Sequence, residues 1–291
     1  MSGLAILLVV VAAFTHATWN LIQKRAASAG AAFIFASCFF AALIYLPWAV
    51  WVLATGKVTY SPEVLAVIAA SGVIHLAYSL SLQRGYQLSD LSIVYPVARG
   101  TGPLISSIGG FLILHEPVSV AGLTGLALVV LGIVLIATEG RLRRFATPAA
   151  ALGVRWGLIT GSLIAAYTVV DGYGVKVLLI QPVLLDWFAN AARLAFMLPV
   201  MAPQYRRARD LMRGKWRHAV AVGALSPLGY ILVLTALQMG APLSFVAPAR
   251  EMSMMVGALF GLFLLGEKAG IWRLVGCAVL LAGVVALVVG K

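Results

Sequence analysis

The chain has 291 residues, of which 62% are hydrophobic and only 10% are charged, and its mean hydropathy is +1.02. A soluble domain carries about 25% charged residues, so this composition excludes an ordinary soluble protein and predicts an all-α integral membrane protein in a lipid bilayer. The formal net charge of +12 does not indicate a nucleic-acid partner, because the basic residues lie between apolar segments and form no interleaved patch.

Ten apolar segments are long enough to cross a membrane, which takes about 20 residues each. In chain order they cover residues 3–23, 31–54, 62–83, 91–114, 117–138, 154–175, 182–203, 219–239, 243–265 and 271–289. The connections between them are short and leave no room for a soluble domain. A basic linker at 141–150 divides the chain into two five-helix halves, 1–140 and 151–291.

Lysine and arginine are distributed unequally between the two sides of this bundle. Of the 21 basic residues, fifteen lie in the connections on one side and three, Lys57, Lys176 and Lys291, on the other, while Arg99, Arg193 and Arg250 lie within spans. The positive-inside rule therefore places both termini on the non-cytoplasmic side of a bacterial-type inner (plasma) membrane. Five spans per half is an odd number, so the second half is inverted relative to the first.

The two halves repeat the same residues at the same spacing. Glu116, Gly125 and Gly132 recur 151 residues later as Glu267, Gly276 and Gly283, and the segment 91–96 (Leu-Ser-Ile-Val-Tyr-Pro) recurs as 243–248 (Leu-Ser-Phe-Val-Ala-Pro). We expect the glycines to allow close helix approach and each glutamate to cap the helix that follows it. A monomer suffices for this design, and a dimer through the glycines remains compatible with it.

These motifs, together with Ala-Thr-Trp-Asn at 17–20, resemble the EamA-type half of the drug/metabolite transporter superfamily. The resemblance covers nearly the whole chain. It implies ten transmembrane helices in two inverted repeats and the export of amino acids or other small metabolites. Within the superfamily, the chain looks most like the aromatic amino acid exporters of the YddG type. The second half departs from the pattern, because its segment 167–171 contains no tryptophan.

Polar and aromatic side chains inside the spans are the candidates for substrate binding, because burying them in a membrane is costly unless they face a cavity or a partner. Helical spacing puts several on shared faces, such as Tyr167 with Asp171 and Tyr95 with Arg99. The candidates are Trp19, Asn20, His75, Tyr78, Tyr95, Arg99, Tyr167, Asp171, Tyr230, Ser244 and Arg250. The alternatives are packing and interface anchoring for the aromatic residues, and helix–helix hydrogen bonds for the histidines and Asn20.

Arg99 and Arg250 are related by the repeat, and each follows a proline, Pro96 or Pro248, by two or three residues. Proline frees backbone groups, and broken helices of this kind often mark a transporter's binding site. A guanidinium there would bind a substrate carboxylate. The alternatives are that Arg250 pairs with its neighbour Glu251, or that both arginines extend to the membrane surface.

The sequence thus predicts an exporter of amino acids that works by alternating access. Aromatic amino acids are the expected substrates, because side chains that can stack on a ring line the expected pocket. The alternative is a flippase or exporter of a lipid-linked or other amphipathic metabolite. An enzyme is not expected: His115-Glu116 is followed by Ser119 where a zinc-binding HExxH motif needs histidine. No metal-ligand spacing is present either, and we expect no cofactor.

Overall fold

The computed structural model describes residues 2–56, 61–89, 91–141, 145, 148–265 and 270–290, and the regular structure in these ranges is helical. The α-helices are α1 (Gly3–Arg25), α2 (Ala31–Thr55), α3 (Pro62–Leu88), α4 (Leu91–Leu112), α5 (Val120–Thr138), α6 (Pro148–Lys176), α7 (Pro182–Met201), α8 (Tyr205–Leu211), α9 (Trp216–Gln238), α10 (Leu243–Ala249), α11 (Met252–Leu265) and α12 (Ile271–Val289). A short 3-10 helix, η1 (Ala27–Ala29), follows α1. The expected all-α class is confirmed.

Eight helices are long and apolar enough to cross a membrane, judged by length and composition over the described residues: α1, α2, α3, α5, α6, α7, α9 and α12. The two other expected spans coincide with α4 and with the pair α10–α11, which is interrupted at Arg250 and Glu251. Boundaries differ by a few residues elsewhere. The largest difference is α6, which begins at Pro148 inside the expected linker, because proline is favourable in the first turn of a helix.

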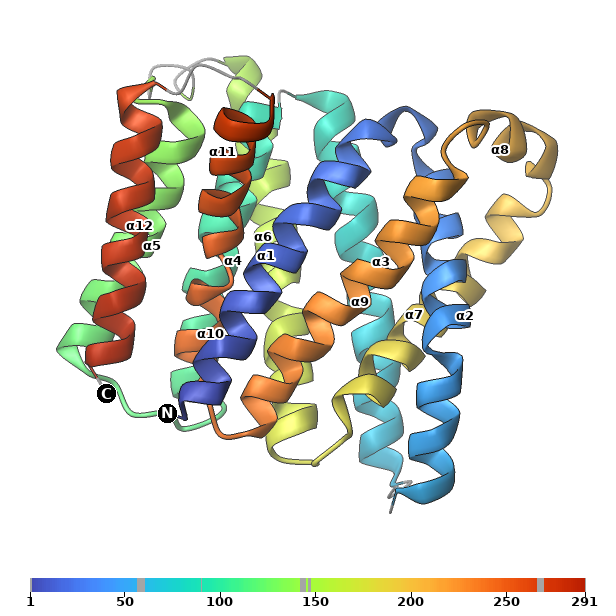
Figure 1. The fold of residues 1–291 in the computed structure, drawn as a ribbon, viewed down its shortest axis with the longest axis horizontal. Coiled ribbons are helices and arrows are strands. Elements are labelled where there is room, and N and C mark those ends of the chain that lie inside the picture. The colour runs from blue at the N-terminus through green and yellow to red at the C-terminus, as the bar shows by residue number, and fades with distance from the viewer. Residues whose placement is uncertain are drawn as a thin grey trace.

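The helices stand side by side in one bundle, with both termini at one end and α8 at the other (Figure 1). The first helix of each half runs in the opposite direction: α1 starts at the end that holds the termini, whereas α6 starts at the α8 end (Figure 1). This arrangement agrees with the inverted relation expected from an odd number of spans per half.

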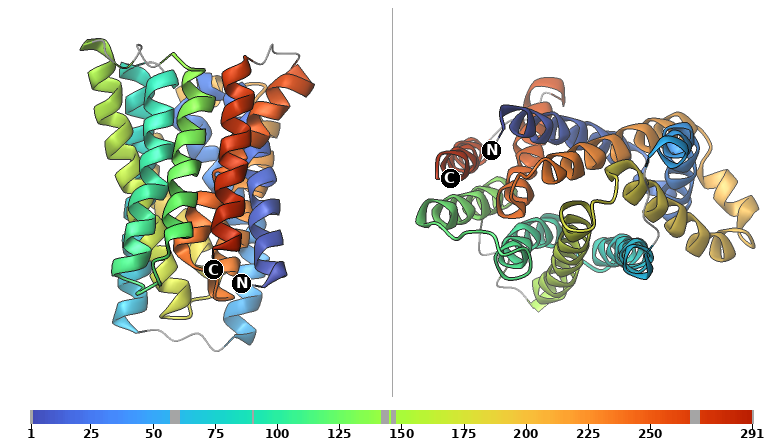
Figure 2. Two further views of the ribbon diagram at one scale, coloured as in Figure 1. Left: turned by 90° about the vertical axis from the view of Figure 1, so that its left-hand side faces the viewer. Right: turned by 90° about the horizontal axis from the view of Figure 1, so that it is seen from below.

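Helices α5 and α12 pack closely together at one side of the bundle (Figure 2). A Cβ atom added at Gly132 would lie 2.6 Å from the backbone nitrogen of Leu280, and one at Gly283 would lie 2.7 Å from that of Val129. Side chains at these glycines would therefore force the helices apart. The expected packing role of the repeated glycines is confirmed, and the contact they make lies within one chain.

The expected role of Glu116 as a cap for the following helix is wrong. That helix, α5, is capped by Ser119, whose hydroxyl oxygen accepts a hydrogen bond from the N–H of Gly122 (3.0 Å). Glu116 instead reaches the second half of the chain, as described below. Its repeat partner Glu267 and Gly266 lie outside the described residues, as do Lys57, Arg143, Arg144, Lys268 and Lys291 of the charge count.

Candidate functional site

A buried group of charged side chains lies where the ninth expected span is broken. Helix α10 ends at Ala249, one residue after Pro248, and α11 begins at Met252, with Arg250 and Glu251 in a turn between the two helices. The equivalent Pro96 leaves α4 continuous from Leu91 to Leu112. The expected broken helix is therefore found in the second half alone among the described residues, and the break brings a carboxylate into the centre of the bundle.

Glu251 is fully buried and joins arginines from both halves. Its Oε2 lies 2.7 Å from Nε of Arg99, whereas its Oε1 lies 4.0 Å from Nε of the adjacent Arg250. Arg99 also donates a hydrogen bond to the hydroxyl of Ser253 (2.8 Å), and its Nη1 lies 3.4 Å from Nε2 of His16. The closer ion pair thus crosses between the halves, and the local pairing of Arg250 with Glu251 is the longer contact.

A second polar group is centred on Asp171, which is also fully buried. Its Oδ2 accepts a hydrogen bond from the Tyr230 hydroxyl (2.5 Å) and lies 3.1 Å from Nε2 of His75. The imidazole of His75 stacks on the ring of Tyr167, with centroids 4.0 Å apart and planes inclined by 23°. Three helices, α3, α6 and α9, are tied together by these contacts.

Aromatic rings connect the two polar groups. Tyr167 meets the rings of Tyr78 and Tyr230 edge-on, at 5.6 Å and 6.0 Å between centroids. The guanidinium of Arg250 lies 6.0 Å from the Tyr167 centroid, within the range of a cation–π contact. Tyr167 therefore contacts both groups: His75 and Tyr230 of the Asp171 group, and Arg250 of the Arg250–Glu251 group.

Several buried polar atoms of this centre have no hydrogen-bond partner among the described residues; Nε of Arg99 and the two carboxylate oxygens of Glu251 take part only in the ion pairs given above. Within the described part of the chain, Oδ1 of Asp171 and Nε of Arg250 are buried and have no hydrogen-bond partner. Arg99 and Arg250 also share one carboxylate, that of Glu251. Buried charges that lack partners are costly, so the site suits a ligand that accepts a hydrogen bond from Arg250 and donates one to Asp171.

Most of the candidates named from sequence meet in this centre: His75, Tyr78, Tyr95, Arg99, Tyr167, Asp171, Tyr230 and Arg250. Three do not join it in the same way. Trp19 is connected to the edge of the centre through His16, and the ring centroids of Trp19 and His16 are 4.6 Å apart. The amide of Asn20 donates to the carbonyl of His16 (2.8 Å) within α1, so this bond is local and is not the helix–helix hydrogen bond of the alternative.

Ser244 lies away from the centre, at the end of the bundle that holds the termini. Its backbone N–H donates to Oε2 of Glu116 (2.9 Å), and that of Leu243 donates to Oε1 (2.6 Å). Nζ of Lys176 lies 2.8 Å from the same Oε1. Burial alone would raise the pKa of Glu116, but Lys176 and the two N–H groups hold it below its ordinary range. Glu116 thus joins α10 of the second half to the end of α4.

Sequence reasoning missed Glu251 and Ser253 as members of the centre. Glu251 was considered as a neighbour of Arg250, and nothing in the sequence indicated that it faces Arg99 more closely. A further polar group on α7, formed by Asp186, Asn190 and Arg193, was missed as well. These three residues are four and three positions apart, which puts them on one face of a helix and could have predicted the group.

The comparisons with known proteins agree with this architecture. A solved structure described as "Crystal structure of protein" has a TM-score of 0.75 with this chain at 14% sequence identity, and the match covers 99% of this chain and 98% of the other. At this identity the likeness concerns the fold. A comparison with curated proteins returned no match.

The sequence profile of the EamA-like transporter family matches this chain twice, at residues 3–138 and 151–289. The two matches cover nearly the whole chain and coincide with the two sets of helices described above. They account for the repeat and for the many apolar helices. The chain belongs to the EamA-like transporter family and is a multi-pass membrane transporter of the drug/metabolite type.

Proposed function

We propose that this transporter exports α-amino acids, preferentially aromatic ones, by alternating access around the polar centre. In this proposal ten spans form two inverted halves, residues 1–140 and 151–291, connected by the linker 141–150. The excess of basic residues on one side supports a bacterial-type inner membrane location with both termini outside the cytoplasm. One chain suffices, because both polar groups of the site are formed within it.

One observation carries the proposal: an unused donor and an unused acceptor flank the same aromatic ring. Nε of Arg250 and Oδ1 of Asp171 are buried without hydrogen-bond partners among the described residues, and both side chains neighbour Tyr167. An amino acid zwitterion carries the complementary pair of groups on one carbon atom. Its carboxylate would bind Arg250, and its ammonium group would bind Asp171.

The balance of charge favours a zwitterion with its carboxylate on the arginine side. Arg99 and Arg250 share the carboxylate of Glu251, so one of these two buried guanidinium groups lacks a close counter-charge. A ligand carboxylate supplies that charge. The ligand's ammonium group, in turn, meets a carboxylate already contacted by His75 and Tyr230, which orient it.

Aromatic preference is supported by the rings around these groups. Tyr78, Tyr167 and Tyr230 form a chain of edge-on contacts, and Tyr95 lies beside Arg99. Edge-on and stacked ring pairs contribute roughly 0.5–1.5 kcal/mol beyond the burial of apolar area. An indole or phenyl side chain placed among these tyrosines would gain such contacts, which an aliphatic side chain would lack.

The test is uptake of labelled tryptophan, phenylalanine and tyrosine into proteoliposomes that contain the purified protein. Tryptamine, which lacks the carboxylate, and indole-3-propionate, which lacks the ammonium group, serve as competitors. We expect phenylalanine to compete with tryptophan and both analogues to fail. Uptake should be lost in Arg250→Gln and retained in Arg155→Gln, an exposed arginine of α6.

One outcome would overturn the proposal, and the others would favour the alternative or remove one of the proposed contacts. The absence of protein-dependent flux for any amino acid would exclude amino acid export, and flux of an amphipathic lipid-linked cargo instead would favour the flippase alternative. Competition by tryptamine as strong as that by phenylalanine would remove the carboxylate contact. Unchanged transport in Tyr78→Ala would remove that residue from the site.

A further inference from the structure

The connection between α7 and α9 is the most strongly basic surface segment of the chain. Residues 203–217, here called the α8 segment, contain Arg206, Arg207, Arg209, Arg213, Lys215 and Arg217 against one acidic residue, Asp210. Within the described residues, Asp210 pairs with Arg213 (3.1 Å), and no ion pair is formed by Arg206, Arg207 or Arg209. The segment therefore exposes several uncompensated positive charges.

The α8 segment is held firmly against the bundle. Met212 is 1% exposed and belongs to a small apolar cluster with Ala26, Ala29 and Phe33, and Ala208 packs against the same cluster. These contacts attach α8 to the turn between α1 and α2. The basic side chains therefore belong to a segment that is packed against the bundle, at the end opposite the two termini (Figure 1).

Exposed aromatic and aliphatic residues accompany these charges. Tyr205, the first residue of α8, is 64% exposed, and Trp216, the first residue of α9, is 45% exposed. Leu211, the last residue of α8, is exposed as well. Tyrosine and tryptophan are enriched where a membrane protein meets the headgroup region of the bilayer. This combination places the α8 segment at the membrane surface, beside lipid headgroups.

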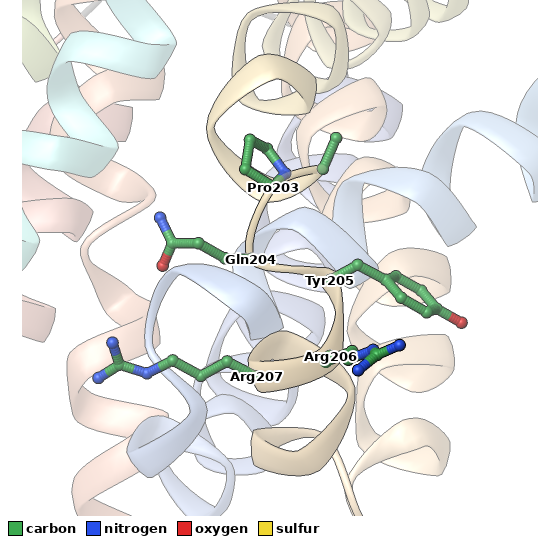
Figure 3. A pocket seen from close by; sticks show the side chains of 6 residues that line it. Pro203, Gln204, Tyr205, Arg206 and Arg207 are labelled. Carbon is green, nitrogen blue, oxygen red and sulfur yellow. The ribbon is translucent and has the colours of Figure 1, made fainter.

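An open cavity of ≈ 590 Å³ lies at the start of the segment, lined by residues 202–207. Figure 3 shows the side chains of Gln204 and Arg207 extending to one side of this turn and those of Tyr205 and Arg206 to the other. Arginine and amide groups are hydrogen-bond donors that suit phosphate oxygens, and arginine binds them in a bidentate manner.

We propose that the α8 segment binds the headgroups of anionic phospholipids, such as phosphatidylglycerol, in the leaflet that borders it. Clusters of four to eight basic residues directly beside a transmembrane helix are attracted to anionic lipid surfaces. The aromatic residues bury their rings at the boundary, while Arg206, Arg207 and Arg209 contact the phosphates. The lipid site shares no residue with the polar centre and does not depend on the identity of the transported substrate.

The test compares lipid retention in two variants that each lose three positive charges. The first is Arg206→Gln/Arg207→Gln/Arg209→Gln in the α8 segment. The second is Arg84→Gln/Arg141→Gln/Arg155→Gln, at three exposed arginines outside it. The purified full-length proteins in a neutral detergent are titrated with dioleoylphosphatidylglycerol, with dioleoylphosphatidylcholine and with glycerol 3-phosphate, and bound molecules are counted by native mass spectrometry.

We expect the unmodified protein to retain phosphatidylglycerol over phosphatidylcholine, and the α8 variant to bind it roughly tenfold more weakly. The control variant should change affinity by less than about twofold, since its arginines lie outside the cluster. Equal losses in both variants would overturn the proposal in favour of a general charge effect. Equal retention of the two lipids would overturn it outright, and glycerol 3-phosphate binding as tight as the lipid would assign the site to a soluble phosphate.

Discussion

The two halves of this transporter agree in sequence at the glycines where they pack against each other and at Arg99 and Arg250, but they differ in the acidic residues of the polar centre. Gly132 and its repeat partner Gly283 both lie in the close contact between α5 and α12. In the polar centre, by contrast, the residue 151 positions before Asp171 is Asn20, and the residue at the same offset before Glu251 is Gly100. The acidic residues of the centre are thus confined to the second half.

This difference explains how a duplicated chain forms one site. Both acidic groups find partners in the first half: Glu251 forms an ion pair with Arg99, and a carboxylate oxygen of Asp171 lies within hydrogen-bonding distance of Nε2 of His75. Had both halves kept the same residue at each position, like charges would face one another across the pseudo-symmetry. Divergence at these positions therefore gives complementary charges to the two halves, while the repeated glycines preserve the scaffold.

The largest expected effect follows from removing the carboxylate that joins the halves. Glu251→Gln keeps the shape of the side chain but leaves Arg99 and Arg250 without their shared counter-charge, and breaking a buried pair in this way costs about 3–5 kcal/mol. The measurement is the thermal unfolding midpoint of the purified protein in detergent. The double variant Arg99→Gln/Glu251→Gln should be less destabilised than the single changes predict together. Additive effects would show that the two side chains are not coupled.

The next largest effect is expected from a substitution that makes the sixth span resemble the first. Asp171→Asn copies the residue that the first half carries and removes the proposed acceptor for the substrate's ammonium group. Losing a charged hydrogen bond of this kind costs about 1.5–3 kcal/mol, which corresponds to a roughly 10- to 100-fold loss of affinity for tryptophan. Binding is measured by scintillation proximity with the labelled amino acid. Asn20→Asp, which adds an acid to the first half, is the control and should not increase affinity.

Hydropathy and helical periodicity were enough to locate the long helices, although not the short α8, and to place Tyr167, Asp171 and Arg99 on inward faces, because these signals are local. The repeated spacing of the glycines likewise predicted close helix packing, but it did not say that α5 and α12 are the helices that meet. The break at Arg250 was foreseen from Pro248, but Pro96 gave the same expectation for α4, which stays continuous. Whether a proline interrupts a helix depends on which neighbouring groups form hydrogen bonds with the backbone groups that the proline leaves free. The local sequence does not show which groups these are.

Partners from distant segments were the part that the sequence did not reveal. Glu116 had a plausible local role at the start of α5, yet it binds the N–H groups of Leu243 and Ser244 more than 120 residues away. Asn20 had a plausible role in the site, yet its amide binds a carbonyl of its own helix. Short polar side chains satisfy local or distant partners at similar cost, so the choice is made by tertiary packing.

A third prediction concerns the scaffold on which the halves agree. Gly132→Ala would place a Cβ atom 2.6 Å from the backbone nitrogen of Leu280, so α5 and α12 must separate, at a cost of about 1–3 kcal/mol. Gly257→Ala in α11 is the matched control, because a Cβ atom there meets nothing within 4 Å. Thermal unfolding should show a lower midpoint for the first variant and an unchanged or higher one for the second. A similar decrease in both would mean that the loss of glycine itself, rather than the close contact, is responsible.

The smallest expected effect is pH-dependent and lies at the outer contact between the halves. Because the pKa of Glu116 is lowered in the folded protein, its contribution to stability is complete above the ordinary glutamate pKa of about 4.3 and is lost as the pH falls through the lowered value. Glu116→Gln should therefore reduce the free energy of unfolding by roughly 1–2 kcal/mol at neutral pH. The difference between the two proteins should shrink below about pH 4.

Urea unfolding of the two proteins between neutral and acidic pH measures this difference. Lys176→Gln removes the cationic partner while leaving the N–H donors of Leu243 and Ser244 in place, so it should produce part of the same loss. A difference between Glu116→Gln and the unmodified protein that stays constant down to the acidic limit would contradict an ionised Glu116. In that case the shape of the Glu116 side chain, and not its charge, would join α10 to the first half.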